Sequence, residues 1–190
     1  MKKRLGPAER LYPMPCALVV GGTMEKADTL AVAWINVMSS TPPTIAMGLR
    51  ETRKTLELMR ETGTFTVNLP SASLVREVDY CGIASGHSAD KFAATGLRLV
   101  PGAVVPTPII EQCPFNIECR ISGEHEVGSY RVIFGEIVET HADESVLAED
   151  DAIDMAALDP LVYIPGLREY HRLGGKVADA YTVGRELLTE

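Results

Sequence analysis

The sequence predicts one domain over residues 1–190, mainly β with flanking helices and therefore of the α+β class. Strand-like and helix-like segments do not alternate regularly, which argues against a doubly wound parallel sheet. Strand-like runs dominate the second half of the chain. The length suits one domain that buries about 70% of its unfolded surface.

Apolar runs mark the strands of the first half. Residues 17–20 run into two glycines, which predicts a buried strand that ends in a turn. A second apolar run, residues 30–35, is too short to assign to a helix. Residues 39–43 are expected to be a loop, because consecutive prolines remove donors and fix φ. Strands are then expected at residues 44–49 and 65–70.

Three short helices are expected, each starting at a hydroxyl residue that can cap it: Thr52, Ser71 and Ser88. The first spans residues 53–62, with Leu56 and Met59 on one face. Gly63 ends this helix and Gly96 ends the third, since glycine suits the left-handed conformation of a helix C-terminus.

The second half predicts a hairpin and a final strand. Residues 114–122 and 130–140 are strand-like, and a polar turn at residues 123–128 separates them. Residues 161–165 form a last short strand, and residues 170–175 form a glycine-ended loop. The tail beyond is expected to be helical or frayed.

Negative charge is concentrated in one segment. The net charge is −8, and the segment 139–159 holds eight carboxylates with no lysine or arginine. The rest of the chain is balanced and shows no basic face of the kind that binds nucleic acid. The acidic segment is expected to be a solvated surface, with a docking surface for a partner as the alternative.

The composition predicts a cytoplasmic protein without a membrane partner. No apolar run approaches the ~20 residues of a membrane span, and the stretch 16–20 is shorter than a signal-peptide core of ~7–15 residues. Neither the four cysteines nor the four histidines form closely spaced pairs. Buried free thiols and no metal site are therefore expected.

A cationic segment and a hydroxyl-rich segment lie one predicted strand apart. Residues 50–55 open a helix with two arginines, a lysine and two threonines. A helix N-terminus offers free N–H groups and the positive end of the dipole, so this segment suits a phosphate monoester. The hydroxyl-rich residues 36–43 suit a ribityl chain and the rim of a planar ring. The alternative is an ordinary helix cap with basic surface residues.

The motifs of several common sites are absent from the sequence. It contains no Gly-x-Gly-x-x-Gly, which argues against a Rossmann dinucleotide site. It also lacks the Walker lysine motif and the nucleophile elbow of serine hydrolases. No side chain is therefore assigned a catalytic role.

Short motifs along most of the chain resemble one family. In order, the chain carries residues 33–40 (AWINVMSS), Pro42-Pro43, residues 65–70 (FTVNLP), Cys81-Gly82, Ser85-Gly86, residues 90–92 (DKF), Gly135-Glu136 and residues 158–161 (LDPL). Their order and spacing resemble the flavin-reductase-like family, most closely its flavoredoxin branch. The resemblance implies a six-stranded antiparallel Greek-key split β-barrel that binds FMN at a homodimer interface.

The resemblance also implies which residues touch the cofactor. The isoalloxazine and ribityl groups should lie, largely through backbone groups, against Trp34, Asn36, Val37, Met38, Ser39, Ser40 and Thr41. The phosphate should be held by Arg50, Arg53, Lys54 and Thr55, and enclosed by Ser85, Gly86 and Lys91. Tyr170 is the candidate for reaching over the ring. Tyr130 stands where relatives carry a histidine, and it is expected either to shield the ring or to fill a barrel edge.

These residues predict an FMN flavoprotein that acts in electron transfer with a redox partner protein, or as an NAD(P)H-dependent flavin reductase. The flavin, rather than a side chain, would supply the chemistry. Tyr130 favours electron transfer, because tyrosine stays neutral up to pH ~10 and cannot act as a cation beside a nicotinamide. The alternative is a binding module without redox function that uses its pocket or segment 139–159 for a ligand or partner.

Overall fold

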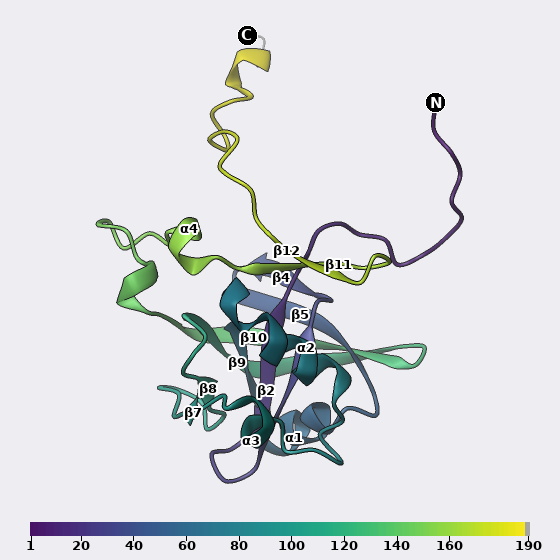
Figure 1. The fold of residues 1–190 in the computed structure, drawn as a ribbon, viewed down its shortest axis with the longest axis vertical. Helices are drawn as coiled ribbons and strands as arrows, with labels where there is room; N and C mark the ends of the chain where they lie inside the picture. The colour runs from purple at the N-terminus through teal and green to yellow at the C-terminus, as the bar shows by residue number, and fades with distance from the viewer. Residues whose placement is uncertain (189–190) are drawn as a thin grey trace.

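A seven-stranded antiparallel sheet forms the body of the molecule in the computed structural model, which describes residues 1–188 (Figure 1). Its strands lie in the order β3-β2-β6-β9-β10-β5-β4. In chain order they are β2 (Ala17–Gly22), β3 (Ala27–Val32), β4 (Ile35–Ser40), β5 (Pro43–Arg50), β6 (Thr64–Leu69), β9 (Phe115–Val127) and β10 (Tyr130–Ala142). The predicted class, mainly β with flanking helices, is confirmed, with seven strands in this sheet instead of six.

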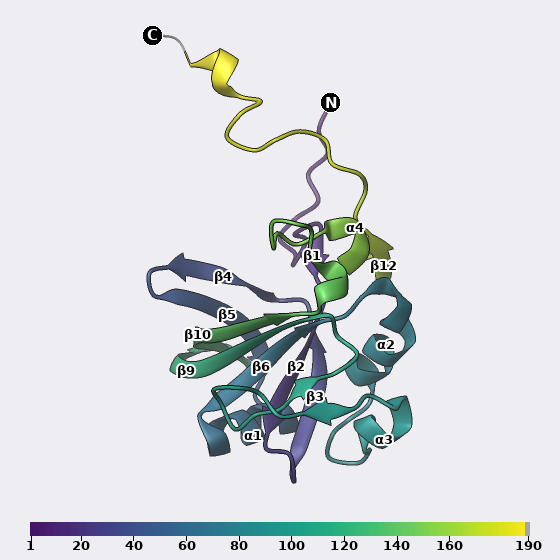
Figure 2. The same cartoon turned by 90° about the vertical axis from the view of Figure 1, so that its left-hand side faces the viewer.

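Smaller elements flank this sheet. A three-stranded sheet, β1-β11-β12, lies at the end where both termini leave the body, and β7 pairs with β8 (Figure 2). These strands are β1 (Met14–Pro15), β7 (Leu99–Val100), β8 (Ile109–Ile110), β11 (Leu161–Ile164) and β12 (Glu169–Arg172). The helices are α1 (Lys54–Thr62), α2 (Val75–Ile83), α3 (Lys91–Thr95) and α4 (Met155–Leu158), with 3₁₀ turns η1 (Ala72–Leu74), η2 (Glu144–Val146) and η3 (Arg185–Leu187).

The barrel is split between β3 and β4. These strands are the two edges of the sheet, yet only Ala33 and Trp34 connect them. Three Cα–Cα steps of 3.8 Å span at most about 11 Å, so the two edges must approach each other at this crossing. No ladder joins β3 to β4 among residues 1–188, so the sheet curls without closing.

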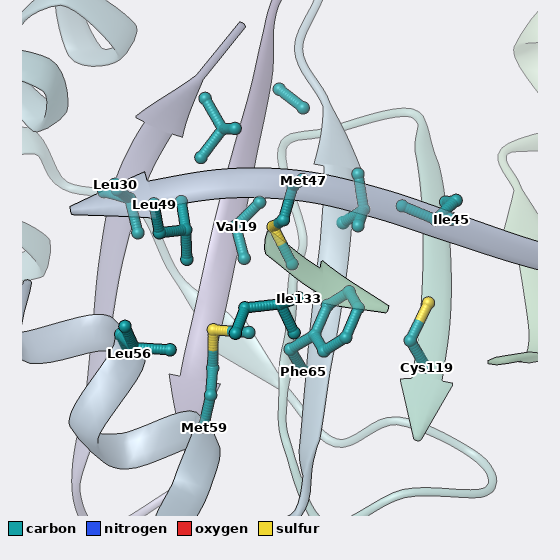
Figure 3. Close-up of a cluster of buried hydrophobic side chains, with 13 residues drawn as sticks. Val19, Leu30, Ile45, Met47, Leu49, Leu56, Met59, Phe65, Cys119 and Ile133 are labelled. Carbon is teal, nitrogen blue, oxygen red and sulfur yellow. The ribbon is translucent and has the colours of Figure 1, made fainter. Parts of the chain in front are cut away.

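The main core fills the inside of this curled sheet, where side chains from several strands converge with the inner face of α1 (Figure 3). Phe65, Met47, Ile133 and Met59 are all buried there. Close packing explains one glycine: a Cβ on Gly135 would lie 2.3 Å from the Phe65 ring. The predicted inner face of the first helix is confirmed, because Leu56 and Met59 are both buried.

β2 is buried on both faces. Ala17 and Val19 belong to the core inside the barrel, whereas Leu18 and Val20 pack in a second cluster beneath α2. This arrangement explains why the strand reads as a continuous apolar run. All four cysteines are buried and free, as predicted. Burial raises the pKa of Cys81 to about 11, so this thiol is protonated near neutral pH.

The prediction of a loop over residues 39–43 is wrong. β4 continues to Ser40 and β5 begins at Pro43, which leaves only Thr41 and Pro42 in the turn. Proline is tolerated here because Pro43 is the first residue of its strand, before the ladder with β10 begins at Thr44.

Two further turns were placed wrongly. The hairpin turn is not at residues 123–128: β9 runs to Val127, and the turn contains only Gly128 and Ser129. The polar residues were mistaken for a turn because this part of β9 is a solvent-exposed ribbon that pairs with β10. Residues 170–172 lie in β12 rather than in a loop, because they pair with β11.

The helix ends were predicted better than the helix starts. Gly63 and Gly96 both adopt the left-handed conformation that ends a helix, with φ of 69° and 71°. Neither Thr52 nor Ser88 caps a helix. Arg53 is the N-cap of α1, without a side-chain bond. Asp90 caps α3 by accepting the N–H of Ala93.

The remaining Ser71 precedes the 3₁₀ turn η1, and α2 starts only at Val75. Residues 173–188 contain turns and η3, while the last two residues of the predicted tail lie outside the described part. Seven of the eight carboxylates of segment 139–159 are exposed, as expected of a solvated surface. No helix among residues 1–188 has both the length and the apolar character needed to cross a membrane.

Candidate functional site

A cleft lies at the split of the barrel. Its cavity of about 350 Å³ is bounded by residues 30–34 on one side and by residues 48–50 of β5 on the other. Arg53 and Tyr130 complete the wall. The cleft is therefore formed where the chain crosses from one edge of the sheet to the other.

The two strands beside the split offer backbone groups for binding. Among residues 1–188, β3 pairs only with β2, and β4 pairs only with β5. An edge strand leaves alternate N–H and C=O groups without ladder partners. A planar heterocycle with donors and acceptors on its rim can use such groups. This is the kind of contact expected of the segment that begins at Trp34.

Trp34, Tyr130 and Arg50 form one cluster in the cleft wall. The ring centroids of Trp34 and Tyr130 lie 4.9 Å apart, with planes 30° from parallel. Arg50 Nε donates to the Tyr130 hydroxyl at 3.2 Å. Tyr130 and Arg50 are cross-strand partners of β10 and β5, so the pairing of these strands brings them together. Tyr130 thus packs on Trp34 and orients Arg50.

The arginines of the cleft differ from neighbouring arginines in their ion pairing. Arg60 and Arg131 are both ion-paired with glutamates. Among the side chains that the structure describes, no carboxylate oxygen lies within 4.0 Å of a side-chain nitrogen of Arg50 or Arg53. The start of α1 follows directly, with its free N–H groups and positive dipole end. This end of the cleft therefore favours an anionic group.

A second cavity of about 300 Å³ shares residues 31–33 with the cleft. Tyr163 and Tyr170 line it, with ring centroids 5.6 Å apart. The Tyr170 hydroxyl donates to Asp79 of α2 at 3.1 Å. Burial raises the pKa of Tyr170 above its usual range, and the Asp79 carboxylate adds to the shift, so Tyr170 is neutral near pH 7. Sequence reasoning selected Tyr170 and missed Asp79 and Tyr163.

Three of the predicted site residues, Thr55, Lys91 and Gly86, lie in a buried network rather than in the open cleft. At its centre is Asp28 of β3, which is 5% exposed. Thr55 Oγ1 donates to the Asp28 carboxylate, and Lys91 Nζ lies 3.5 Å from its Oδ1. A Cβ on Gly86 would come 2.3 Å from that same oxygen. Sequence reasoning missed Asp28, although a carboxylate within a strand was a signal for it.

Lys54 and Ser85 lie away from the cleft. Lys54 lines another cavity, of about 600 Å³, bounded by residues 24–28 and 86–92. Ser85 is exposed, and its Oγ accepts the N–H of His87 at 3.4 Å. The predicted phosphate ligands are thus divided: Arg50 and Arg53 face the cleft, whereas Lys54 does not line it.

The residues of β4 lie on a hairpin that projects from the body (Figure 2). Asn36 and Met38 line an apolar cavity of about 710 Å³ between this hairpin and the N-terminal segment. Val37 is 59% exposed and Met38 is 56% exposed. Residues 39–41 form the tip, where Ser39 Oγ accepts the N–H of Thr41. Of the predicted residues of segment 34–41, Trp34 alone lines the cleft.

Comparison with known proteins gives a consistent family match. A model of the flavin reductase like domain matches residues 9–174. Flavoredoxin of Desulfovibrio vulgaris (Miyazaki F) is 37% identical, with a TM-score of 0.92 over 97% of this chain and 100% of that one. Flavoredoxin from Methanosarcina acetivorans is 28% identical, with a TM-score of 0.92 over 99% and 100%. A protein of Archaeoglobus fulgidus is 34% identical over 136 residues, 71% of this chain and 76% of that relative.

Proposed function

The chain belongs to the flavin reductase-like family, as its motifs predicted, and we propose that it binds FMN at the barrel split and acts as an electron-transfer flavoprotein. One observation carries this proposal: Arg50 and Arg53, which have no carboxylate partner among the described side chains, lie at one end of a cleft between two free sheet edges. A flavin with one phosphate combines a planar ring with donors and acceptors on its rim and a single anionic end.

The residues of the cleft support FMN over a flavin dinucleotide. Arg50 and Arg53 provide one cationic end that suits a phosphate monoester. Lys91, which is buried, already faces Asp28 and is not open to the cleft.

Each group of residues has a distinct role in this proposal. Arg50 and Arg53 bind the phosphate, and the edge backbone around Trp34 orients the ring. Tyr163 and Tyr170 cover the neighbouring cavity and limit the access of water. Bound FMN would supply the redox chemistry, while the protein sets its orientation and environment.

Tyr130 favours an electron carrier over an NAD(P)H-dependent reductase. Its ring is stacked on Trp34 and its hydroxyl accepts a hydrogen bond from Arg50, so it fills this part of the cleft wall with a phenol ring. A protein that keeps its flavin resident would receive electrons from a redox partner protein. NAD(P)H is the rival donor, and a nicotinamide would have to approach past this tyrosine.

The first experiment identifies the cofactor. We expect the purified protein to carry FMN, or to bind it stoichiometrically after soaking, as shown by its absorption spectrum and by chromatography of the extracted flavin. Extraction of FAD would contradict the assignment of one phosphate. Failure to bind any flavin would instead support a binding module without redox function.

The second experiment separates the two redox roles. The holoprotein is mixed anaerobically with NADH or NADPH, and bleaching of the flavin is followed, with Tyr130→His as the matched variant. We expect slow bleaching of the wild type and faster bleaching of the variant. Bleaching of the wild type at about 1 s⁻¹ or faster would replace the carrier with a reductase.

We also propose that the protein is a homodimer in a reducing, cytoplasmic setting. β4 is a sheet edge whose hairpin exposes Val37 and Met38, and an apolar cavity lies beside it. Exposed apolar surface at a sheet edge is typical of an interface. Four free thiols support the reducing compartment. Sedimentation equilibrium tests the dimer, and a monomer that retains FMN would contradict an interfacial site.

A further inference from the structure

Asp28 connects three segments, of which the start of α1 adjoins the cationic end of the cleft. It lies on β3 and accepts the hydroxyl of Thr55, the second residue of α1. Lys91, the first residue of α3, brings its Nζ to 3.5 Å from the same carboxylate and donates to the Thr29 carbonyl. Gly86 closes against the carboxylate, with no room for a Cβ. One buried side chain therefore holds β3, α1 and the segment before α3 together.

The energetics of this pair argue against a role in stability alone. The Asp28 and Lys91 side chains are only 7% and 3% exposed. Removing two charges from water costs about as much as their attraction returns, so a well-packed apolar pair would serve stability equally well. An apolar pair would not provide a directed acceptor for the Thr55 hydroxyl. What the carboxylate adds is a fixed position for its partners.

The position that it fixes is the first turn of α1. Thr55 is held from one side by Asp28, and from another by β2, where a Cβ on Gly21 would lie 2.5 Å from the Thr55 carbonyl oxygen. Arg53 is the N-cap directly before this turn. Its N–H donates at 3.1 Å to the carbonyl of Arg50, the last residue of β5. A displacement of Thr55 would therefore be passed to both arginines.

We propose that Asp28 is a positioning residue for the phosphate end of the cofactor, a role that rests on the proposed function. It sets the place of Arg50 and Arg53 through Thr55 and contributes no contact to the phosphate. A carboxylate repels a phosphate, so any loss of phosphate binding on its removal must arise through the groups that it holds. This property makes the role of Asp28 measurable.

The test compares FMN with riboflavin, which lacks the phosphate, in fluorescence titrations of the apoprotein. We expect Asp28→Asn and Thr55→Val each to weaken FMN binding about tenfold, or 1.4 kcal/mol, and riboflavin binding less than twofold. Thr55→Ser keeps the hydroxyl and should restore the wild-type affinity. Glu25→Gln is the matched control, because Glu25 is an exposed carboxylate that lines the cavity beside Asp28; it should change neither affinity.

Loss of the carboxylate alone leaves Lys91 buried without a counter-charge, which can unfold the protein. The double variant Asp28→Asn, Lys91→Met removes both charges, and we expect it to regain most of the lost melting temperature while it keeps the FMN-specific loss. Equal losses for FMN and riboflavin, or tighter FMN binding by Asp28→Asn, would overturn the positioning role. A wild type that binds neither flavin would instead contradict the proposed function.

Discussion

Two buried carboxylates, Glu118 on β9 and Asp28 on β3, have different kinds of partners. Glu118 is fully buried, and its oxygens accept the backbone N–H groups of a loop, at 2.7 Å from Ala103, 2.9 Å from Val104 and 2.7 Å from Val105. His141 donates to it at 2.6 Å. Asp28 instead binds the side chains of Thr55 and Lys91.

This difference separates a structural anchor from a positioning residue. The donors to Glu118 include three successive backbone N–H groups of one loop, so Glu118 stabilises the fold around it. The hydroxyl donor of Thr55, at the start of α1, links Asp28 to the candidate site. The comparison predicts that the two carboxylates act on different measurable quantities: Glu118 on the free energy of unfolding, and Asp28 on the affinity for a phosphate.

The largest effect is expected for Glu118→Gln. The amide cannot accept all four hydrogen bonds, and its NH₂ group would face backbone donors in a buried site. We expect the free energy of unfolding to fall by about 3 kcal/mol, measured by urea denaturation of the apoprotein. The folded fraction should bind FMN with unchanged affinity. A selective loss of FMN binding would break the distinction between the two carboxylates.

The next prediction compares two cations of segment 50–55, one that faces the cleft and one that does not. Arg50 faces the cleft, whereas Lys54 lines a separate cavity. A hydrogen bond to a charged group contributes about 1.5–3 kcal/mol, so Arg50→Ala should weaken FMN about 10- to 100-fold and leave riboflavin almost unchanged. Lys54→Ala should weaken FMN less than threefold. Titration calorimetry measures both, and equal losses for the two variants would place the phosphate between the cavities.

The third prediction concerns how the contribution of Glu118 to the free energy of unfolding depends on pH. Burial alone would raise the pKa of Glu118, but the hydrogen bonds from His141 and the loop amides outweigh it and hold the pKa below its usual range. Glu118 therefore stabilises the fold above the unfolded-state pKa of about 4.3, and this contribution is lost as the pH falls through the lowered folded pKa. Each unit of lowering corresponds to about 1.4 kcal/mol.

Denaturation of the wild type and of Glu118→Gln between pH 7 and pH 3 measures the contribution of the Glu118 carboxylate as the difference between their free energies of unfolding. We expect the two stability curves to converge as the pH falls below about 4.3. Parallel curves would show that the ionised carboxylate is not what the loop binds.

The sequence predicted the fold better than the site because the two depend on different information. Apolar runs and glycines located β2, β6 and the ends of α1 and α3, since burial and left-handed caps are local requirements. The turn at residues 123–128 was misplaced because its polar residues lie in a ribbon stabilised by a partner strand. Such pairing is not visible in the segment itself.

The sequence selected only some of the residues that line the candidate cleft, for a similar reason. Arg50 and Arg53 could be selected from their place at a helix start, a local signal. Whether a cation is paired depends on residues far away in the chain. Lys91 faces Asp28, which lies 63 positions earlier in the sequence, and is not open to the cleft. The stacking of Tyr130 on Trp34 likewise depends on the pairing of β10 with β5.

The smallest expected effect tests whether the Tyr130 hydroxyl orients Arg50 from the cleft. Asp28 is proposed to fix the start of α1 from the buried side of the same segment. Tyr130→Phe keeps the ring that stacks on Trp34 but removes the hydroxyl that accepts from Arg50 Nε at 3.2 Å. A hydrogen bond of this kind contributes about 0.5–1.5 kcal/mol, so FMN binding should weaken about 2- to 10-fold.

Riboflavin binding should be unchanged by Tyr130→Phe, because the stacked ring survives and the phosphate is absent. Tyr130→Ala removes both the ring and the hydroxyl, so it should weaken both flavins. Combining Tyr130→Phe with Arg50→Ala in a double-mutant cycle decides the mechanism. If the hydroxyl acts through Arg50, its removal costs nothing once Arg50 is gone. An undiminished loss in the Arg50→Ala background would show that Tyr130 contacts the phosphate end by itself.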